Sequence, residues 1–111
     1  MKDLSDLTTP AAVHRKLLEN DVQKQCVDWM RSRGYWARKF ASISQRSLPD
    51  FLFSQPCLMF ATEFKAPGKT STPAQLDEQK AMRDAGWIVF ECDDFEAFKR
   101  TVWRLETLGH V

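Results

Sequence analysis

The segment that most constrains this chain is residues 58–66, LMFATEFKA, which predicts a β-strand. The pleat of a strand sends alternate side chains to opposite faces. One face would carry Leu58, Phe60, Thr62 and Phe64, and the other Met59, Ala61, Glu63 and Lys65. The predicted strand therefore places the charged groups of Glu63 and Lys65 side by side on one face.

Other segments predict the elements before this strand. Thr9 and Pro10 are typical of an N-cap and a first helical position, and the helix would run to a C-terminal cap at Gly34, with room for a break at residues 20–21. Its core-facing stripe is Val22, Cys26 and Met30. We expect a strand at residues 35–40, a loop at 42–48, and a short strand at 51–53 that turns at 54–56.

The second half of the chain continues the alternation of helix and strand. A helix is expected from Thr72 to Gly86, with Ala81, Met82 and Ala85 on its inner side. Residues 87–92, WIVFEC, are continuously apolar and predict a strand buried on both faces. A last helix would be capped by Asp93, with Glu96 completing a capping box. Its apolar stripe is Phe95, Phe98, Val102 and Leu105. The element order predicts a small α/β sandwich.

A length of 111 residues indicates one domain, residues 10–111, behind a flexible tail at 1–9. The N-terminus has no secretory pattern and no segment is apolar enough to span a bilayer, so we expect a cytoplasmic protein without a membrane partner. Three separated cysteines, Cys26, Cys57 and Cys92, indicate buried reduced thiols.

The net charge of +1 hides an uneven distribution. Residues 24–46 contain one acid, Asp28, against six bases: Lys24, Arg31, Arg33, Arg38, Lys39 and Arg46. Residues 84–96 are acidic instead. The basic stretch fits a surface that attracts phosphates, and it fits equally well a solvated helix end followed by a charged strand.

Residues 63–75, EFKAPGKTSTPAQ, can be interpreted in two ways. Gly68-Lys69-Thr70 has the ending of a phosphate-binding P-loop, but that loop needs a glycine five residues earlier, where Glu63 stands. The helix also restarts at Thr72 rather than at Lys69. We therefore expect no nucleotide cofactor, and a turn whose Lys69 is available to a DNA phosphate.

The second interpretation is a metal-dependent nuclease site. Asp50 begins one strand and Glu63 lies on the next, so a hairpin would let both carboxylates hold a hard divalent cation. Lys65 could then orient water or offset charge on a phosphate. Each piece has an ordinary alternative: an exposed Glu63–Lys65 ion pair, a Pro-Asp turn, a capping-box Gln75 and a solvated Glu19.

Taken together, these pieces match a longer pattern. Its members are Glu19, Gln23, Gly34, Lys39, Pro49-Asp50, residues 63–69 (EFKAPGK), Gln75 and Ala85-Gly86. From Glu19 to Phe98 the chain resembles the VRR-NUC branch of the PD-(D/E)XK nuclease superfamily. One departure is Ser47, where the family usually has glycine.

The resemblance implies a restriction-endonuclease-like core, a small mixed sheet of about four strands flanked by helices. It implies a Mg²⁺ or Mn²⁺ site made by Asp50, Glu63, Glu19 and the carbonyl of Phe64. Lys65 would be the catalytic lysine, Glu19 would complete the metal site, and Gln75 would support it.

The activity implied is a divalent-metal-dependent, structure-specific DNA endonuclease of the phage type, acting in DNA repair or replication. A homodimer resolving Holliday junctions is expected, with Trp103 either at the dimer interface or widening the last helix's stripe. The alternatives are a nickase or flap nuclease of the same fold and a DNA-binding module that does not cleave. The six bases of residues 24–46 and Lys69 would contact the DNA backbone.

Overall fold

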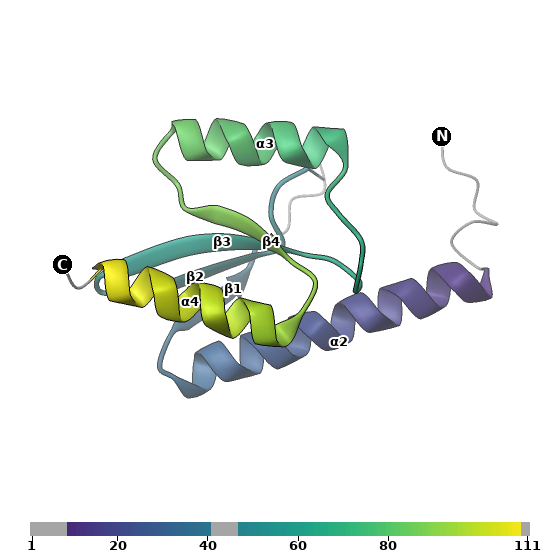
Figure 1. Ribbon diagram of the computed structural model, residues 1–111, viewed down its shortest axis with the longest axis horizontal. Helices are drawn as coiled ribbons and strands as arrows, with labels where there is room; N and C mark the ends of the chain where they lie inside the picture. The colour runs from purple at the N-terminus through teal and green to yellow at the C-terminus, as the bar shows by residue number, and fades with distance from the viewer. Residues whose placement is uncertain (1–8, 41–46, 110–111) are drawn as a thin grey trace.

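The computed structural model describes residues 9–40 and 47–109 (Figure 1). In these residues the elements are α2 (Pro10–Ser32), β1 (Trp36–Lys39), β2 (Phe51–Gln55), β3 (Leu58–Phe64), α3 (Pro73–Asp84), β4 (Val89–Cys92) and α4 (Phe95–Gly109). The strands form one sheet in the order β1-β2-β3-β4, antiparallel throughout except for the parallel pair β3–β4. The predicted element order and mixed sheet are confirmed.

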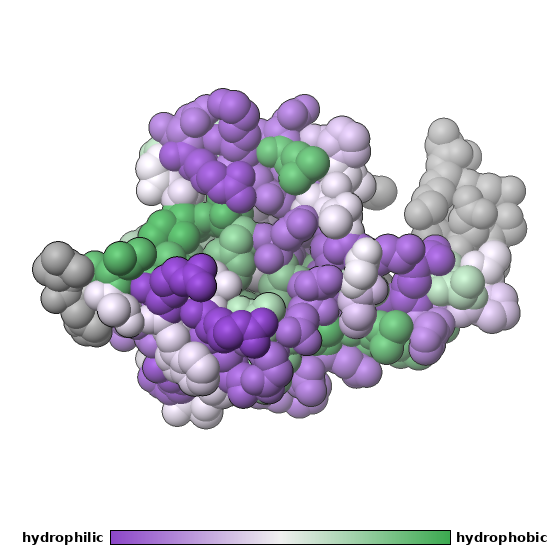
Figure 2. Space-filling model, in the orientation of Figure 1, coloured by the Kyte–Doolittle hydropathy of each residue, from purple (hydrophilic) through white to green (hydrophobic). Residues whose placement is uncertain are grey.

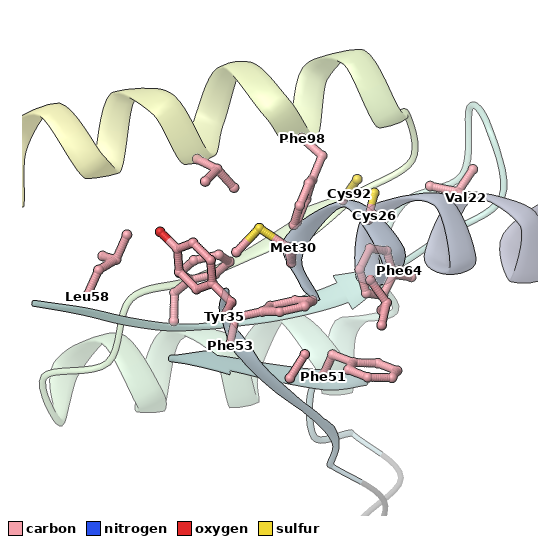
Figure 3. Packing of buried hydrophobic residues seen from close by; sticks show 14 residues of the cluster. Val22, Cys26, Met30, Tyr35, Phe51, Phe53, Leu58, Phe64, Cys92 and Phe98 are labelled. Atoms are coloured by element: carbon pink, nitrogen blue, oxygen red, sulfur yellow. The ribbon is translucent and has the colours of Figure 1, made fainter. Parts of the chain in front are cut away.

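The sheet lies between two unequal layers of helix. α2 and α4 cover one face and α3 covers the other (Figure 1). On the side of α2 and α4, an aromatic cluster fills the core. Phe53 contacts the rings of Phe60, Phe64 and Phe98 at centroid distances of 5.2–6.4 Å. Figure 3 shows Phe53, Phe64 and Phe98 within this cluster. On the α3 side the buried cluster is smaller, consisting of Ala61, Met82 and Val89. The first face therefore supplies most of the apolar burial that holds the sheet together.

Local capping sets the helix boundaries that the sequence predicted. The Thr9 hydroxyl accepts from the Ala12 N–H, and Thr72 and Gln75 form a reciprocal capping box at the start of α3. Gly34 and Gly86, which follow α2 and α3, adopt positive φ. The next N–H group closes each helix end: Tyr35 donates to the Met30 carbonyl, and Trp87 donates to the Met82 carbonyl. These are glycine-terminated helix ends of the kind that need a left-handed residue.

Two helix predictions are wrong. α2 is continuous across residues 20–21. Val22 packs into the core on the same stripe as Cys26, so the helix keeps one buried face beyond this point. Asp94, and not Asp93, caps α4: its carboxylate accepts from the Ala97 N–H. Glu96 pairs with Lys99 instead of completing a capping box.

Three burial predictions also fail. The strand at residues 87–92 is the shorter β4, an edge strand, and Trp87 and Ile88 before it are 37% and 40% exposed. Figure 2 shows apolar surface, in green, between α3 and α4 at this edge. The buried residues of α3 are Gln79 and Met82, whereas Ala81, on the outer side of the helix, and Ala85, the C-cap residue after its last turn, are exposed. Cys57 is exposed in the β2–β3 turn, while Cys26 and Cys92 are buried.

In the described residues, no helix is both long and apolar enough to cross a membrane. The predicted tail lies outside the described residues except for Thr9, and Arg46 lies outside them too.

Phe53→Ala should lower the free energy of unfolding by about 3–5 kcal/mol, since it removes a ring that is 1% exposed and contacts four other rings. Met59→Ala, at a side chain that is 57% exposed, should cost well under half as much. Urea unfolding followed by circular dichroism measures both. Equal losses would contradict a core centred on Phe53.

Candidate active site

The pairing of β2 with β3 brings Asp50 next to Glu63. Phe51 lies opposite Thr62, and the Asp50 N–H donates to the Thr62 carbonyl at 3.1 Å. The Asp50 carboxylate accepts from the Phe64 N–H at 2.8 Å, which fixes its orientation. Because Glu63 faces away from the aromatic core, both carboxylates lie on the sheet face that α3 covers.

Gln75 on α3 joins Lys65 to Glu63. Its Oε1 accepts from Lys65 Nζ at 2.7 Å, and its Nε2 donates to Glu63 Oε1 at 3.0 Å. Lys65 Nζ itself lies 3.6 Å from Glu63 Oε1, too far for a direct hydrogen bond. The amide of Gln75 therefore positions both charged groups, in addition to its role in the capping box.

The Glu63 carboxyl group is strongly perturbed by its surroundings. Burial and the neighbouring charge of Asp50 raise its pKa from 4.5 to about 8; Glu19 adds to the rise and Lys65 opposes it. Its Oε2 is buried and has no hydrogen-bond partner among the described residues. The same is true of Thr62 Oγ1, but Thr62 alternates with Glu63 along β3 and so lies on the other face of the sheet, with Phe60 and Phe64. A buried carboxylate oxygen without a partner is costly, so Oε2 is suited to a ligand that carries positive charge.

The turn between β3 and α3 is held by residues that the sequence analysis missed. Glu91 accepts from the Ser71 N–H and hydroxyl, and Gln79 donates to the same hydroxyl. Asp93 accepts from the Gly68 N–H at 2.9 Å, where a P-loop would bind phosphate. The sequence feature that could have indicated these bonds is Gln79, a polar residue one helical turn after Gln75. These bonds fix the start of α3 and hence the position of Gln75.

The predicted DNA-contacting bases divide into two groups. Lys24 pairs with Asp28, and Arg33 pairs with Glu106 at 2.8 Å, so both are engaged within the protein. Arg31 and Arg38 meet at the edge of β1, while Lys39 and Lys69 are exposed. The basic stretch is thus not one continuous patch.

Glu19, on α2, lies near enough to influence the pKa of Glu63. In the part of the chain that the structure describes, no three His, Cys, Asp or Glu side chains converge into a metal-binding group. The structure therefore brings together Asp50, Glu63, Lys65 and Gln75, and it leaves Glu19 at the margin of this set. Glu63 Oε2, which has no partner among the described residues, and the neighbouring Asp50 carboxylate are oxygen donors of the kind that a hard divalent cation takes.

Comparisons with known proteins agree with this geometry. No family model matches the chain. A relative named "Putative nuclease p44", from Acyrthosiphon pisum secondary endosymbiont phage 1, is 35% identical over 80 residues, which are 71% of this chain and 86% of the relative. A solved structure titled "VRR_NUC domain" superposes with a TM-score of 0.69 at 26% identity, over 76% of this chain and 92% of that one.

The chain belongs to the VRR-NUC family. The predicted restriction-endonuclease-like core is confirmed with it, since the mixed sheet and its flanking helices match the solved VRR_NUC domain. In this VRR-NUC chain Asp50 directly precedes β2, Glu63 lies on β3 and Lys65 directly follows β3.

The raised pKa of Glu63 makes stability depend on pH. The folded state holds this proton up to a pH of about 8 and the unfolded chain releases it near 4.5, so stability should fall as pH rises between these values. Urea unfolding at pH 5 and pH 8.5, with a chelator present, should show a steeper fall for the wild type than for Glu63→Gln. Glu96→Gln, at a side chain 65% exposed, should behave like the wild type. Identical pH dependence in all three proteins would argue against a perturbed Glu63.

Proposed function

We propose that this VRR-NUC protein is a divalent-metal-dependent DNA endonuclease that hydrolyses phosphodiester bonds. The observation that carries the proposal is the buried Glu63 oxygen without a partner, beside Asp50 and within reach of a lysine held by Gln75. Membership of the VRR-NUC family and the phage relative named as a nuclease support the same activity.

Asp50 and Glu63 would hold Mg²⁺ or Mn²⁺, with the Phe64 carbonyl and Glu19 as the further ligands that we propose. A bound divalent cation supplies Lewis-acid chemistry and lowers the pKa of water. Cation binding also favours the ionised form of Glu63 and offsets its repulsion with Asp50.

Lys65 contributes through its placement. An ammonium group has three donors, and the Gln75 amide takes one of them. The others can meet water or a phosphate oxygen next to Glu63. Because the side chain is only 15% exposed, its charge acts where solvent screening is weak. Lys65 is thus suited to stabilise negative charge that develops on the phosphate.

Branched DNA is the substrate we propose, recognised by shape because no element among residues 9–40 and 47–109 resembles a base-reading helix. Resolving a Holliday junction takes two incisions, which would require a twofold dimer. Trp103, 49% exposed on α4 and in edge contact with Trp29, is the proposed interface residue. A nickase or flap nuclease would use the same site once per substrate.

Cleavage of labelled four-way junction, flap and linear duplex, with and without Mg²⁺ or Mn²⁺, tests the proposal. We expect metal-dependent hydrolysis that falls about 100-fold or more in Glu63→Gln and Lys65→Ala. Lys80→Ala removes a lysine paired with Asp84 on the outside of α3 and should change nothing. Symmetric cuts on two strands of the junction would support the dimer, and single cuts would favour the nickase.

Binding of DNA without cleavage under any metal would instead indicate a module that does not cleave. Cleavage that survives in Glu63→Gln would contradict the proposed site.

Gln75→Ala should reduce the cleavage rate about 10- to 100-fold, because Lys65 and Glu63 lose the group that positions them. The matched control is Thr72→Ala, which breaks the capping box and leaves the amide in place. Both should lose about 1 kcal/mol of stability, but only Gln75→Ala should lose rate. A similar rate in the two variants would show that Gln75 acts only as a cap.

A further inference from the structure

β1 carries two side chains, outside the candidate active site, on the same face of the sheet as that site. Trp36 lies opposite Ser54, Arg38 opposite Leu52, and the Phe40 N–H donates to the Asp50 carbonyl. Alternate residues share a face, so Trp36 and Arg38 lie on the Asp50 side of the sheet. Successive side chains on one face of a strand are about 7 Å apart, so Arg38 lies nearer to Asp50 and Trp36 farther from it.

α3 leaves this part of the face open. It packs over β4 and the Ala61–Val89 cluster, at the other edge of the sheet. Trp36 is consequently 49% exposed, and Arg38 is exposed beside it. The Arg38 guanidinium lies 5.1 Å from the centre of the Trp36 ring, which holds both side chains together.

Two cations meet at the outer edge of β1. Arg31 from α2 and Arg38 both donate to the Ala37 carbonyl, each at 2.9 Å. Neither forms an ion pair with a carboxylate of the described residues, in contrast to Arg33, which is paired with Glu106. Two guanidinium groups on one carbonyl oxygen repel each other unless an anion joins them, and their planar donors match phosphate oxygens.

We propose that Arg31, Trp36 and Arg38, here named the β1 cluster, bind an unpaired DNA strand next to the candidate active site. The guanidinium groups would contact its phosphates, and the Trp36 ring would stack on a base. Stacking needs a base whose face is accessible, which the interior of a duplex does not offer. The inference rests on the proposed function for its biological meaning, and it names the unpaired strand at a fork or flap as the recognised part of the substrate.

Binding without divalent metal isolates this surface from catalysis. Fluorescence anisotropy in EDTA would compare a labelled oligothymidine of about ten nucleotides, a forked duplex and a blunt duplex. Trp36→Ala should weaken binding of the single strand and the fork about tenfold and leave the blunt duplex within about twofold. Arg38→Ala should weaken all three, because phosphates are common to them.

The matched control is Trp87→Ala. This tryptophan is also exposed, at 37%, but it precedes β4, at the opposite edge of the sheet from β1. Its removal should leave binding of the short single strand unchanged. Trp36→Phe keeps an aromatic ring and should retain most of the affinity. Circular dichroism and sedimentation of each variant report folding and oligomeric state.

The outcomes separate this inference from the proposed nuclease. Equal effects of Trp36→Ala on single-stranded and blunt DNA, or no effect, would overturn the inference even if metal-dependent cleavage is intact. A dimer that Trp36→Ala converts to monomer would also overturn it, because the face would then be a protein interface. Selective loss of single-strand binding in a protein that never cleaves would uphold it while the nuclease proposal fails.

Discussion

The antiparallel register of β2 against β3 is the constraint on which the site depends. It pairs Phe51 with Thr62 and so sets Asp50 beside Glu63. A slip of one residue would turn the side chains of one strand to the other face and direct Glu63 toward the aromatic core. Phe53, Phe60 and Phe64 oppose that slip, because their burial would be lost with it. The core therefore maintains the register that the chemistry needs.

The site itself works against stability. Glu63 is buried beside Asp50, and one of its oxygens has no partner in the described residues. Such an arrangement persists only when its surroundings are rigid, and here the rigid element is the start of α3, where Thr72, Gln75 and the Ser71–Glu91 bonds interlock. One glutamine thus serves both the helix end and the charged pair.

The net charge is close to zero, but the acidic and basic side chains have different roles in the structure. Glu91, Asp93 and Asp94 each accept a backbone N–H at a turn or helix start, and Glu106 receives both Arg33 and the Tyr35 hydroxyl. Lys24 and Arg33 are paired as well. Arg31 and Arg38 keep their positive charge uncompensated by carboxylates of the described residues, at the outer edge of β1. The acidic side chains are thus bonded within the protein, whereas the two arginines remain exposed, where a nucleic acid can reach them.

The sequence by itself determined the element order, the capping residues Thr9 and Thr72, the alternation along residues 58–66 and the set Asp50, Glu63, Lys65 and Gln75. These are short-range properties, because helix periodicity, pleating and cap chemistry act within a few residues. It misjudged the burial of residues 87–92, which depends on which strand lies at the edge of the sheet, and the inner side of α3, which depends on how the helix packs on the sheet. It could not show that Arg31 and Arg38 share one carbonyl or that Glu63 Oε2 lacks a partner. Only the tertiary structure decided these, since the first depends on how α2 lies against β1 and the second on which residues surround Glu63.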